Sequence, residues 1–354
     1  MSVAKRPAVK KTPKKAKAKV AKEPGGSVKP GASRKAPSKG PVAAPGKSGA
    51  KPAAKPAARP AAARKVASGA ESEGGSALVV ELRTLLGENG DAIRAKTQEL
   101  FIAIMAGAEG EAMLGLVALA FKRAAELGSA EAWVDFGRCL WNGWGVDRDV
   151  EAALAAYERA ADLGSDHAAY TLALAAWERE DWASAQRWAK LALKGGDPVG
   201  AVRYLLGRMA FHGHGTRKAL ARSYALFEEA AERGDSDAMY ELFALGSTGQ
   251  GTEKDEAKAV AWLRKAAERN QPRALFNLGA FHAMGSFGFP QDFDASATYY
   301  EAASEAGHGR ASATLGVMYL SGQGVPRNET KAEEFFARAN AQSFDVKGFL
   351  EGIE

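Results

Sequence analysis

Small and apolar residues recur along the chain at intervals too long for any single helix or strand. The clearest mark of this recurrence is a pair of glycines with one or two residues between them. It occurs five times: Gly143 and Gly145, Gly213 and Gly215, Gly249 and Gly251, Gly285 and Gly288, and Gly322 and Gly324. The first glycines are separated by 70, 36, 36 and 37 residues, so one unit within the longest interval lacks the pair. Self-similarity at such a period is typical of stacked repeats.

Each unit predicts two helices joined by a glycine-rich turn. Six residues before the turn stands another small residue, which would let paired helices approach closely, at Gly137, Gly207, Gly279 and Gly316, with Phe243 as the exception. An alanine-rich segment follows the turn and usually closes with Gly or Asn, which suits a left-handed helix cap. Because neither helix can bury its apolar face alone, the units must stack.

Two segments carry a family resemblance. ATLGVMYLSGQGV (313–325) and the segment 258–268, with AVAWLRKAAE at its centre, resemble the Sel1-like repeat, a branch of the tetratricopeptide superfamily. The resemblance covers about residues 130–341 and implies an all-α, right-handed superhelical solenoid of helix–turn–helix repeats. The unit His167–Pro198 has Glu178-Arg179-Glu180-Asp181 instead of the glycines and is closer to a plain tetratricopeptide hairpin.

Composition divides the chain further. Residues 1–76 contain nineteen Lys or Arg, three acids, ten prolines and no Phe, Trp or Tyr, whereas the remaining 278 residues carry a net charge of about −10. Because so few large apolar groups cannot offset the entropy of ordering a backbone, we predict a disordered basic tail. The expected domains are this tail (1–76), N-terminal helices with a capping repeat (77–129), the repeats (130–345) and a C-terminal end (346–354).

The tail resembles linker-histone-type tails in composition. Its lysines and arginines predict sequence-independent, salt-sensitive binding of DNA or RNA by counterion release. An anionic membrane surface, an acidic protein and a solubilising role without a partner are the alternatives. The candidate contact residues are Lys5, Arg6, Lys10, Lys11, Lys14, Lys15, Lys17, Lys19, Lys51, Lys55, Arg59, Arg64 and Lys65.

Few residues suggest catalysis or metal binding. His212 and His214 form an H-x-H pair in one loop, but no carboxylate, Cys or third His lies nearby in the sequence, so we expect no metal. Cys139, the single cysteine, has no identifiable base and suits a reducing compartment. The segment GPVAAPGKS (40–48) lacks the spacing and flanking elements of a phosphate-binding loop. We expect no catalytic residues, no cofactor and no enzyme activity.

Neither a secretory signal nor a membrane span is expected. The most apolar window, Leu100–Phe121, contains Glu109 and Glu111 with three glycines, which indicates soluble helices. The expected location is cytoplasmic, with nucleoid association if the tail binds DNA.

An aromatic series is the strongest indication of a binding surface. Tyr170, Tyr204, Tyr240 and Phe276 recur at intervals of 34, 36 and 36 in the first helix of each unit, and by the resemblance this position faces a concave groove. Aromatic and Arg residues dominate protein interfaces, although packing between repeats would produce the same series. The candidate groove residues for a protein or peptide ligand are Arg138, Trp141, Tyr170, Trp177, Tyr204, Arg208, Phe211, Tyr240 and Phe276.

These features favour an interaction scaffold whose groove binds a protein or peptide and whose tail tethers it to nucleic acid. Two alternatives remain open. One is a bacterial signalling or envelope-regulatory adaptor with an incidental tail. The other is an exported effector in which the tail serves as an export or nuclear address in a host cell. The repeat by itself does not identify the partner or the oligomeric state.

Overall fold

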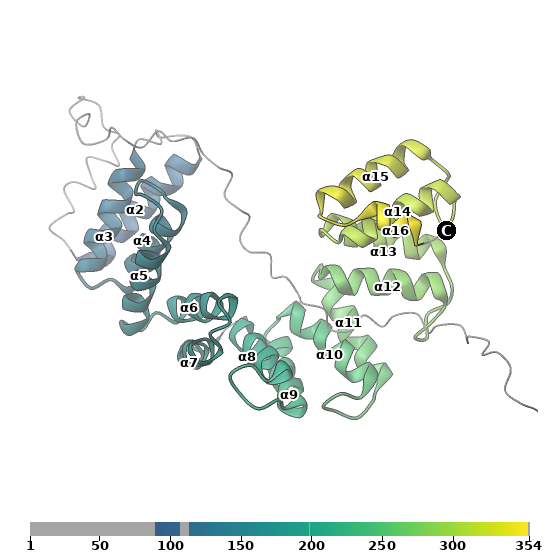
Figure 1. Ribbon diagram of the computed structural model, residues 1–354, viewed down its shortest axis with the longest axis horizontal. Helices are drawn as coiled ribbons and strands as arrows, with labels where there is room; N and C mark the ends of the chain where they lie inside the picture. Colours follow the sequence, from purple (N-terminus) through teal and green to yellow (C-terminus); the bar gives the residue numbers. More distant parts are fainter. Residues whose placement is uncertain (1–88, 107–112, 198, 353–354) are drawn as a thin grey trace, which may run out of the picture. The chain divides into compact units, whose positions relative to one another are not determined.

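The computed structural model describes residues 89–106, 113–197 and 199–352, and all of them belong to the second of two units, 1–42 and 43–354, into which the chain divides. The expected tail therefore lies outside the described residues, as do 77–88 and 107–112 of the expected N-terminal helices. The described part is helical (Figure 1). Its helices are α2 (Gly90–Met105), α3 (Leu114–Glu126), α4 (Ala130–Asn142), α5 (Val150–Asp162), α6 (Asp166–Glu178), α7 (Trp182–Ala192), the 3-10 turn η2 (Leu193–Gly195), α8 (Ala201–His212), α9 (Leu220–Glu232), α10 (Ser236–Thr248), α11 (Glu256–Glu268), α12 (Pro272–Met284), α13 (Phe293–Glu305), α14 (Gly309–Ser321), α15 (Glu329–Ala341) and α16 (Val346–Glu351).

Helices α4 to α15 form consecutive pairs that follow one plan. The two helices of each pair pack side by side, and the second helix of a pair packs on the first helix of the next (Figure 1). The pair α6–α7 keeps this plan although it lacks the glycine turn. The expected all-helical solenoid of helix–turn–helix repeats is thus confirmed.

Capping side chains fix where many of these helices begin. Asp149 accepts a hydrogen bond from the Ala152 N–H (2.9 Å), and Asp255 accepts one from the Lys258 N–H (2.9 Å). Such a cap satisfies a donor that the first turn leaves unpaired and stabilises a helix by about 1 kcal/mol. The caps therefore fix the first residue of these helices.

The small residues of the first helices mark close helix crossings, as expected. The glycines at these positions face aromatic rings of the second helices: Gly137 faces Tyr157, Gly207 faces Phe227, Gly279 faces Tyr300 and Gly316 faces Phe336. A Cβ atom on Gly207 would lie 2.6 Å from the Phe227 ring, closer than any relaxed contact. In the exceptional pair, Phe243 replaces the glycine and Leu263 stands where the other pairs have the ring.

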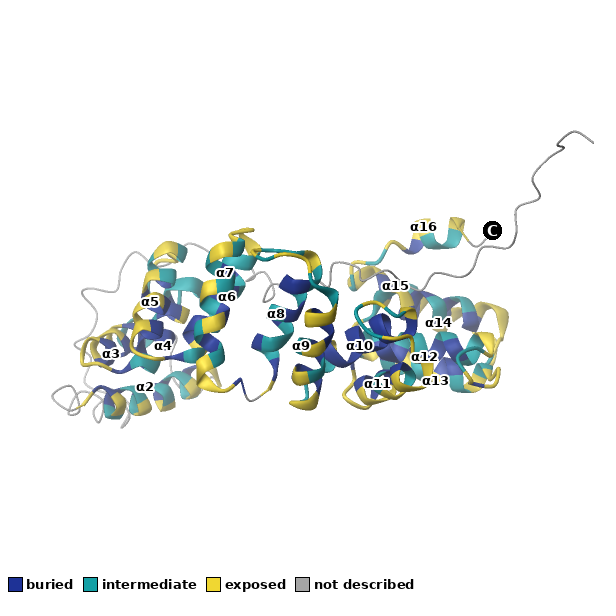
Figure 2. Ribbon diagram, turned by 90° about the horizontal axis from the view of Figure 1, so that it is seen from below, coloured by how far each residue is buried: buried dark blue, intermediate teal, exposed yellow. Residues whose placement is uncertain are grey.

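The described core has two large clusters that meet at α8, and a small third one, Ala313, Ala339 and Val346, at the C-terminal end. Val202 and Leu205 of α8 belong to the N-terminal cluster, whereas Tyr204 and Phe211 of the same helix pack against the C-terminal one. Helix α10 is buried from Ala238 to Ser247 and is dark along most of its length in Figure 2. Helix α8 therefore joins the two large clusters, whereas the buried residues of α10 belong to the C-terminal one.

None of the helices in the described ranges combines the length and the apolar character needed to cross a membrane.

Candidate protein-binding surface

The structure places the four repeating aromatics on four consecutive first helices. Tyr170 lies on α6, Tyr204 on α8, Tyr240 on α10 and Phe276 on α12, and we call this set the aromatic ladder. Tyr240 is 5% exposed, whereas the other three are half-buried. Burial raises the pKa of both Tyr170 and Tyr240 above its usual value, so both hydroxyls stay protonated near neutral pH. The ladder is therefore in part a packing feature, and only part of it reaches the surface.

Arg273 of α12 covers the buried member of the ladder. Its guanidinium carbon lies 4.1 Å from the centre of the Tyr240 ring. The same group donates to Glu241 (3.1 Å) and to Asp237 (3.3 Å). Burial raises the pKa of the Glu241 carboxyl, and the nearby Arg273 acts against that rise. The Asn277 side chain completes the cluster by donating to the Tyr240 hydroxyl (3.3 Å).

Two side chains of the next repeat cover Phe276. The His308 ring stacks on it with the ring centres 4.5 Å apart and the planes 17° apart, and the Arg310 guanidinium carbon lies 5.6 Å from its centre. His308 Nδ1 also accepts a hydrogen bond from the Ala311 N–H (3.2 Å) at the start of α14. Burial lowers the pKa of His308 to about 4, and Arg310 adds to this effect. The imidazole is therefore neutral near pH 7.

Arg208 of α8 joins two aromatic residues of different repeats. Its guanidinium carbon lies 4.6 Å from the centre of the Trp177 ring, which comes from α6, and 5.8 Å from that of Tyr204. The structure thus brings the expected residues Trp177, Tyr204 and Arg208 together.

A common arrangement emerges along this face. In three places a guanidinium of one repeat lies over an aromatic ring of the preceding repeat: Arg208 over Trp177, Arg273 over Tyr240 and Arg310 over Phe276. Such contacts are worth about 0.5–1 kcal/mol at exposed sites and about 2 kcal/mol when desolvated.

Sequence reasoning missed three charged residues of this face. Asp237, Arg273 and Arg310 each stand three residues before the ladder position, in three consecutive first helices. Repetition of charge at one helix position was the signal that could have identified them.

Two expected groove residues lie on α4, apart from the ladder contacts. Arg138 lies 3.5 Å from the carboxylate of Asp135, which Arg94 of α2 also binds at 2.7 Å. Asp135 is 4% exposed, and its burial raises the pKa of its carboxyl. Trp141 packs against the N-terminal core cluster, and α4 has the buried Val134 at the ladder position. No contact within the described ranges connects Arg138 or Trp141 to the ladder.

The two histidines of the loop after α8 pack against aromatic rings. His214 stacks on Trp182 of α7, with ring centres 3.9 Å apart, and His212 stacks on His214 with ring centres 5.1 Å apart. Phe211, the remaining expected groove residue, lies 5.0 Å from His212. Burial and the neighbouring His214 lower the pKa of His212. His214 is therefore a packed residue rather than a free surface one.

These histidines do not form a metal-binding arrangement. Metal ligands converge on one point, whereas the two imidazoles lie face to face, with planes 21° apart. Within the described ranges, no group of three or more His, Cys, Asp or Glu side chains could hold an ion. Burial raises the pKa of the Cys139 thiol to about 12, which leaves it protonated and unreactive near neutral pH.

Comparisons with known proteins agree with this architecture. The Sel1 repeat model matches residues 136–165, 201–235, 236–271, 272–308 and 310–344, and the break after the first match contains the pair without the glycine turn. No curated protein is similar enough to count as a match.

Two solved structures resemble the chain. A Sel1 repeat protein from Oxalobacter formigenes is 24% identical with a TM-score of 0.59, over 79% of this chain and 91% of that one. The protective antigen c5321 of uropathogenic Escherichia coli strains, which displays an SLR fold, is 23% identical with a TM-score of 0.51, over 74% of this chain and 68% of that one. At these identities the likeness concerns the fold. Sel1 repeat proteins generally serve as protein-interaction scaffolds, and the five matched units show that this chain is a Sel1 repeat protein.

Proposed function

We propose that the protein is a non-enzymatic scaffold that binds a peptide or protein segment across the aromatic ladder. The observation that carries this proposal is the set of three guanidinium groups, from α8, α12 and α14, that each lie over an aromatic ring of the preceding repeat. Arg, Tyr and Trp are the residues most enriched among interface hot spots. Each guanidinium also has five N–H donors, which suit the carbonyl and carboxylate oxygens of a peptide.

A random peptide library displayed on phage and selected on the full chain tests this proposal. The selected peptides are then titrated against R208A/R310A and against the control R233A/R327A, which removes two exposed arginines outside the ladder contacts. We expect the ladder variant to weaken binding at least about tenfold, equivalent to about 1.4 kcal/mol, and the control to leave it unchanged. Peptides that bind all three proteins equally would place the site elsewhere.

We propose in addition that the tail tethers the scaffold to nucleic acid. Its nineteen basic and three acidic residues support this proposal, because each neutralised phosphate releases counterions. Replacing the thirteen candidate tail residues, from Lys5 to Lys65, by Gln should abolish or strongly reduce a DNA mobility shift. The wild-type shift should weaken steeply with salt.

The alternatives predict different outcomes for the same variant. An adaptor with an incidental tail keeps its function when the tail is neutral. An exported effector predicts that a fusion of residues 1–76 to a fluorescent protein accumulates in the nucleus of a eukaryotic cell, and that the neutral tail does not.

A further inference from the structure

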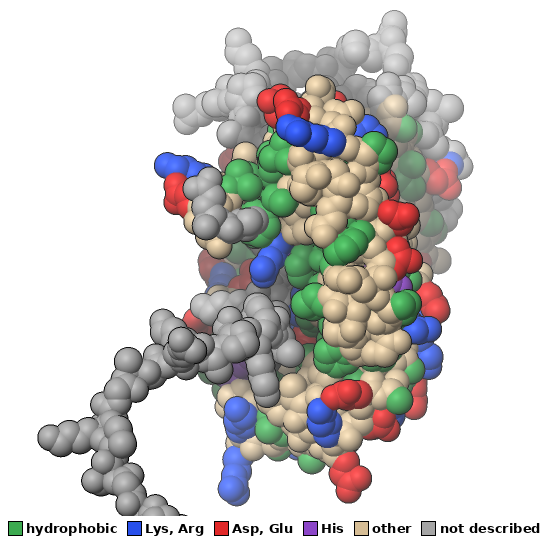
Figure 3. All heavy atoms as spheres, turned by 90° about the vertical axis from the view of Figure 1, so that its right-hand side faces the viewer, with side chains coloured by type: hydrophobic (Ala, Val, Ile, Leu, Met, Phe, Trp, Pro, Cys, Tyr) green, Lys and Arg blue, Asp and Glu red, His purple; other side chains and the backbone are tan. Residues whose placement is uncertain are grey.

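Basic side chains of the solenoid concentrate in one stretch. Residues 182–222 contain eight Lys or Arg and one Asp or Glu. Residues 77–181 contain nine basic and eighteen acidic residues, and residues 223–354 contain twelve basic and twenty acidic ones. The net charges are therefore +7 for the central stretch, −9 before it and −8 after it. On the face of the molecule drawn in Figure 3, acidic side chains gather along one edge, while Lys and Arg are scattered over it.

The single acid of the basic stretch is engaged inside the fold. Asp197 is 4% exposed and accepts hydrogen bonds from the backbone N–H groups of Val202 and Arg203 and from the Arg203 side chain. Arg203 is bound in turn to Glu229 at 2.8 Å. Asp197 therefore neutralises only Arg203.

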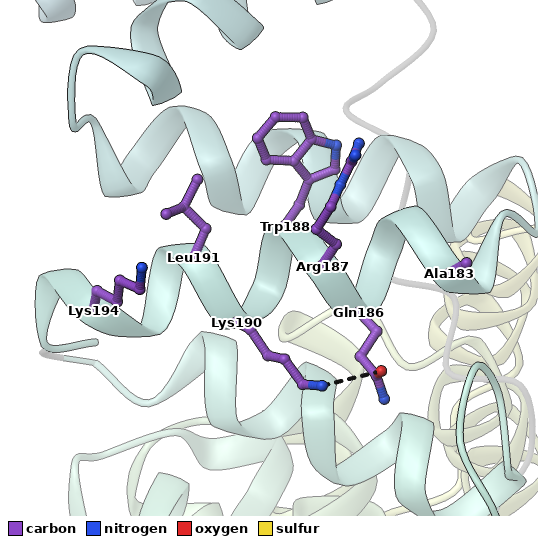
Figure 4. Close-up of a pocket in the computed structure, with 7 residues that line it drawn as sticks. All are labelled: Ala183, Gln186, Arg187, Trp188, Lys190, Leu191 and Lys194. Atoms are coloured by element: carbon purple, nitrogen blue, oxygen red, sulfur yellow. Dashed lines mark hydrogen bonds between the residues drawn. The ribbon is translucent and has the colours of Figure 1, made fainter.

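Three cations of this stretch lie on one side of α7 and of the 3-10 turn η2 that continues it, and we call them the basic face: Arg187 and Lys190 of α7 and Lys194 of η2. Helix α7 buries Ala185, Ala189 and Ala192 against the core, and the helical period puts the three cations on the opposite side. With their neighbours they line a shallow pocket (Figure 4).

Among the residues that the structure describes, the cations of the basic face contact neutral groups rather than carboxylates. The Arg187 guanidinium lies 4.8 Å from the centre of the Trp188 ring, and Lys190 donates to the Gln186 side chain at 3.2 Å (Figure 4). In the described ranges, no carboxylate lies within ion-pair distance of the three cations. The acidic group that acts electrostatically on Arg187 is Asp181, which is already engaged as the cap of α7.

The loop between α8 and α9 brings further cations to the start of α7. A Cβ atom on Gly215 would lie 2.5 Å from the Trp182 carbonyl oxygen, so the loop packs directly on this helix, and the His214–Trp182 stack holds it there. This loop and the first turn of α9 carry the exposed Arg217, Lys218 and Arg222. At 1.5 Å per residue, the path from Trp182 to Lys194 is about 18 Å long.

We propose that the basic face and the adjoining loop bind the phosphate backbone of duplex DNA without regard to sequence. The inference rests on the proposed role of the tail, because it gives the solenoid a second contact with the same partner. Duplex DNA carries one negative charge per about 1.7 Å of its axis when both strands are counted, so the segment of about 18 Å from Trp182 to Lys194 would run beside about ten phosphates of the two strands. Charges more than about 8–10 Å away are largely screened, so the carboxylates that oppose this local field are the nearest ones, Asp181 at the start of α7 and Asp166 beside Gly195.

The aromatic residues of the basic stretch favour a duplex over a single strand. Binding of single strands uses bare rings on which bases stack. Here Arg187 covers Trp188, and His214 covers Trp182. The face therefore offers charge rather than stacking platforms.

The test uses the full chain, a mixed-sequence DNA duplex of about 30 base pairs and a series of salt concentrations. The face variant R187A/K190A/K194A is compared with the control K254A/K331A/K347A, which removes the same charge from exposed lysines elsewhere, and with the neutral-tail variant. Because each phosphate contact contributes about 0.9 to the slope of log affinity against log salt, the face variant should lower the slope by about 2 to 3. The control should change the slope by less than about 0.5. Circular dichroism checks that each variant is folded.

The outcomes separate this inference from the proposed role of the tail. Equal slopes for the face variant and the control overturn the inference, even if the neutral-tail variant fails to bind. If the neutral-tail variant binds normally and the face variant does not, the face is supported and the tail proposal fails. A face variant that loses affinity for a poly-glutamate peptide but not for DNA overturns the inference in favour of an acidic protein. Preference for duplex RNA over DNA by more than about tenfold also overturns it.

Discussion

At the scale of single residues, the packing of the ladder depends on the protonation state of His308. Its ring stacks on Phe276, and its Nδ1 atom must be unprotonated to cap α14. Burial lowers its pKa from 6.5 to about 4, so the folded protein binds this proton more weakly than the unfolded chain does. Acid therefore favours unfolding through this residue.

Lowering the pH from 7 to 5 should decrease the free energy of unfolding by about 2 kcal/mol through the protonation of His308 in the unfolded chain. Its contribution to stability is complete above pH 6.5, falls as the pH drops towards 4, and changes no further below that value. The variant H308N keeps a hydrogen-bond acceptor for the cap but has no imidazole to protonate. Its free energy of unfolding, measured in urea, should therefore not show this decrease between pH 7 and pH 5. The exposed His167 provides the control H167N, which should retain the wild-type pH dependence. Equal losses in H308N and the wild type would contradict the assignment.

At the scale of helix pairs, stability depends on matching a small residue with a large one. Gly207 of α8 lies beneath the Phe227 ring of α9, whereas the pair α10–α11 has two large side chains at these positions, Phe243 and Leu263. The Phe243 ring packs against the next repeat instead, with its centre 5.9 Å from that of Phe281 and 6.0 Å from that of Phe287.

Substituting Gly207→Ala should destabilise the protein by about 1–3 kcal/mol in urea unfolding, since the added methyl group meets the Phe227 ring. Adding F227L to this variant should recover part of the loss by restoring space. G246A is the matched control, because a Cβ atom there would lie 3.4 Å from the Ala259 side chain and Ala favours the helix. If G207A is as stable as the wild type, the close crossing at Gly207 does not limit stability.

At the scale of the whole molecule, charge is distributed unevenly between tail and solenoid. The tail carries about +16 and the rest of the chain about −10. Opposite charges on one chain attract at low ionic strength, and salt weakens that attraction. We therefore hypothesise that the tail occupies the ligand-binding face until a polyanion competes for it.

This hypothesis predicts that, at low salt, the neutral-tail variant binds a ladder-selected peptide more tightly than the wild type, by at least about threefold, or about 0.6 kcal/mol. At high salt the two affinities should converge, and duplex DNA added to the wild type at low salt should raise its affinity to that of the variant. Fluorescence anisotropy of a labelled peptide measures all three comparisons. Unchanged affinity of the neutral-tail variant at low salt would rule out autoinhibition.

Much of the architecture could be predicted from the sequence because its signals are local. The glycine pairs at intervals near 36 residues identify the turns, and the small residues such as Gly207 identify the helix crossings. The ladder aromatics were correctly assigned to the first helices for the same reason. Helix formation and turn chemistry depend on residues only a few positions apart, which a linear pattern records.

Only the tertiary structure decided how these residues are used. It buried Tyr240 beneath Arg273 but left Tyr204 half-buried, and it turned the cations of α7 outward by burying the alanines opposite them. Contacts such as Arg273 with Tyr240 join residues a full repeat apart, so they depend on how neighbouring repeats stack. The sequence by itself determined the helix pairs and their period. Which faces are exposed, and which charges remain unpaired, followed from the packing between repeats.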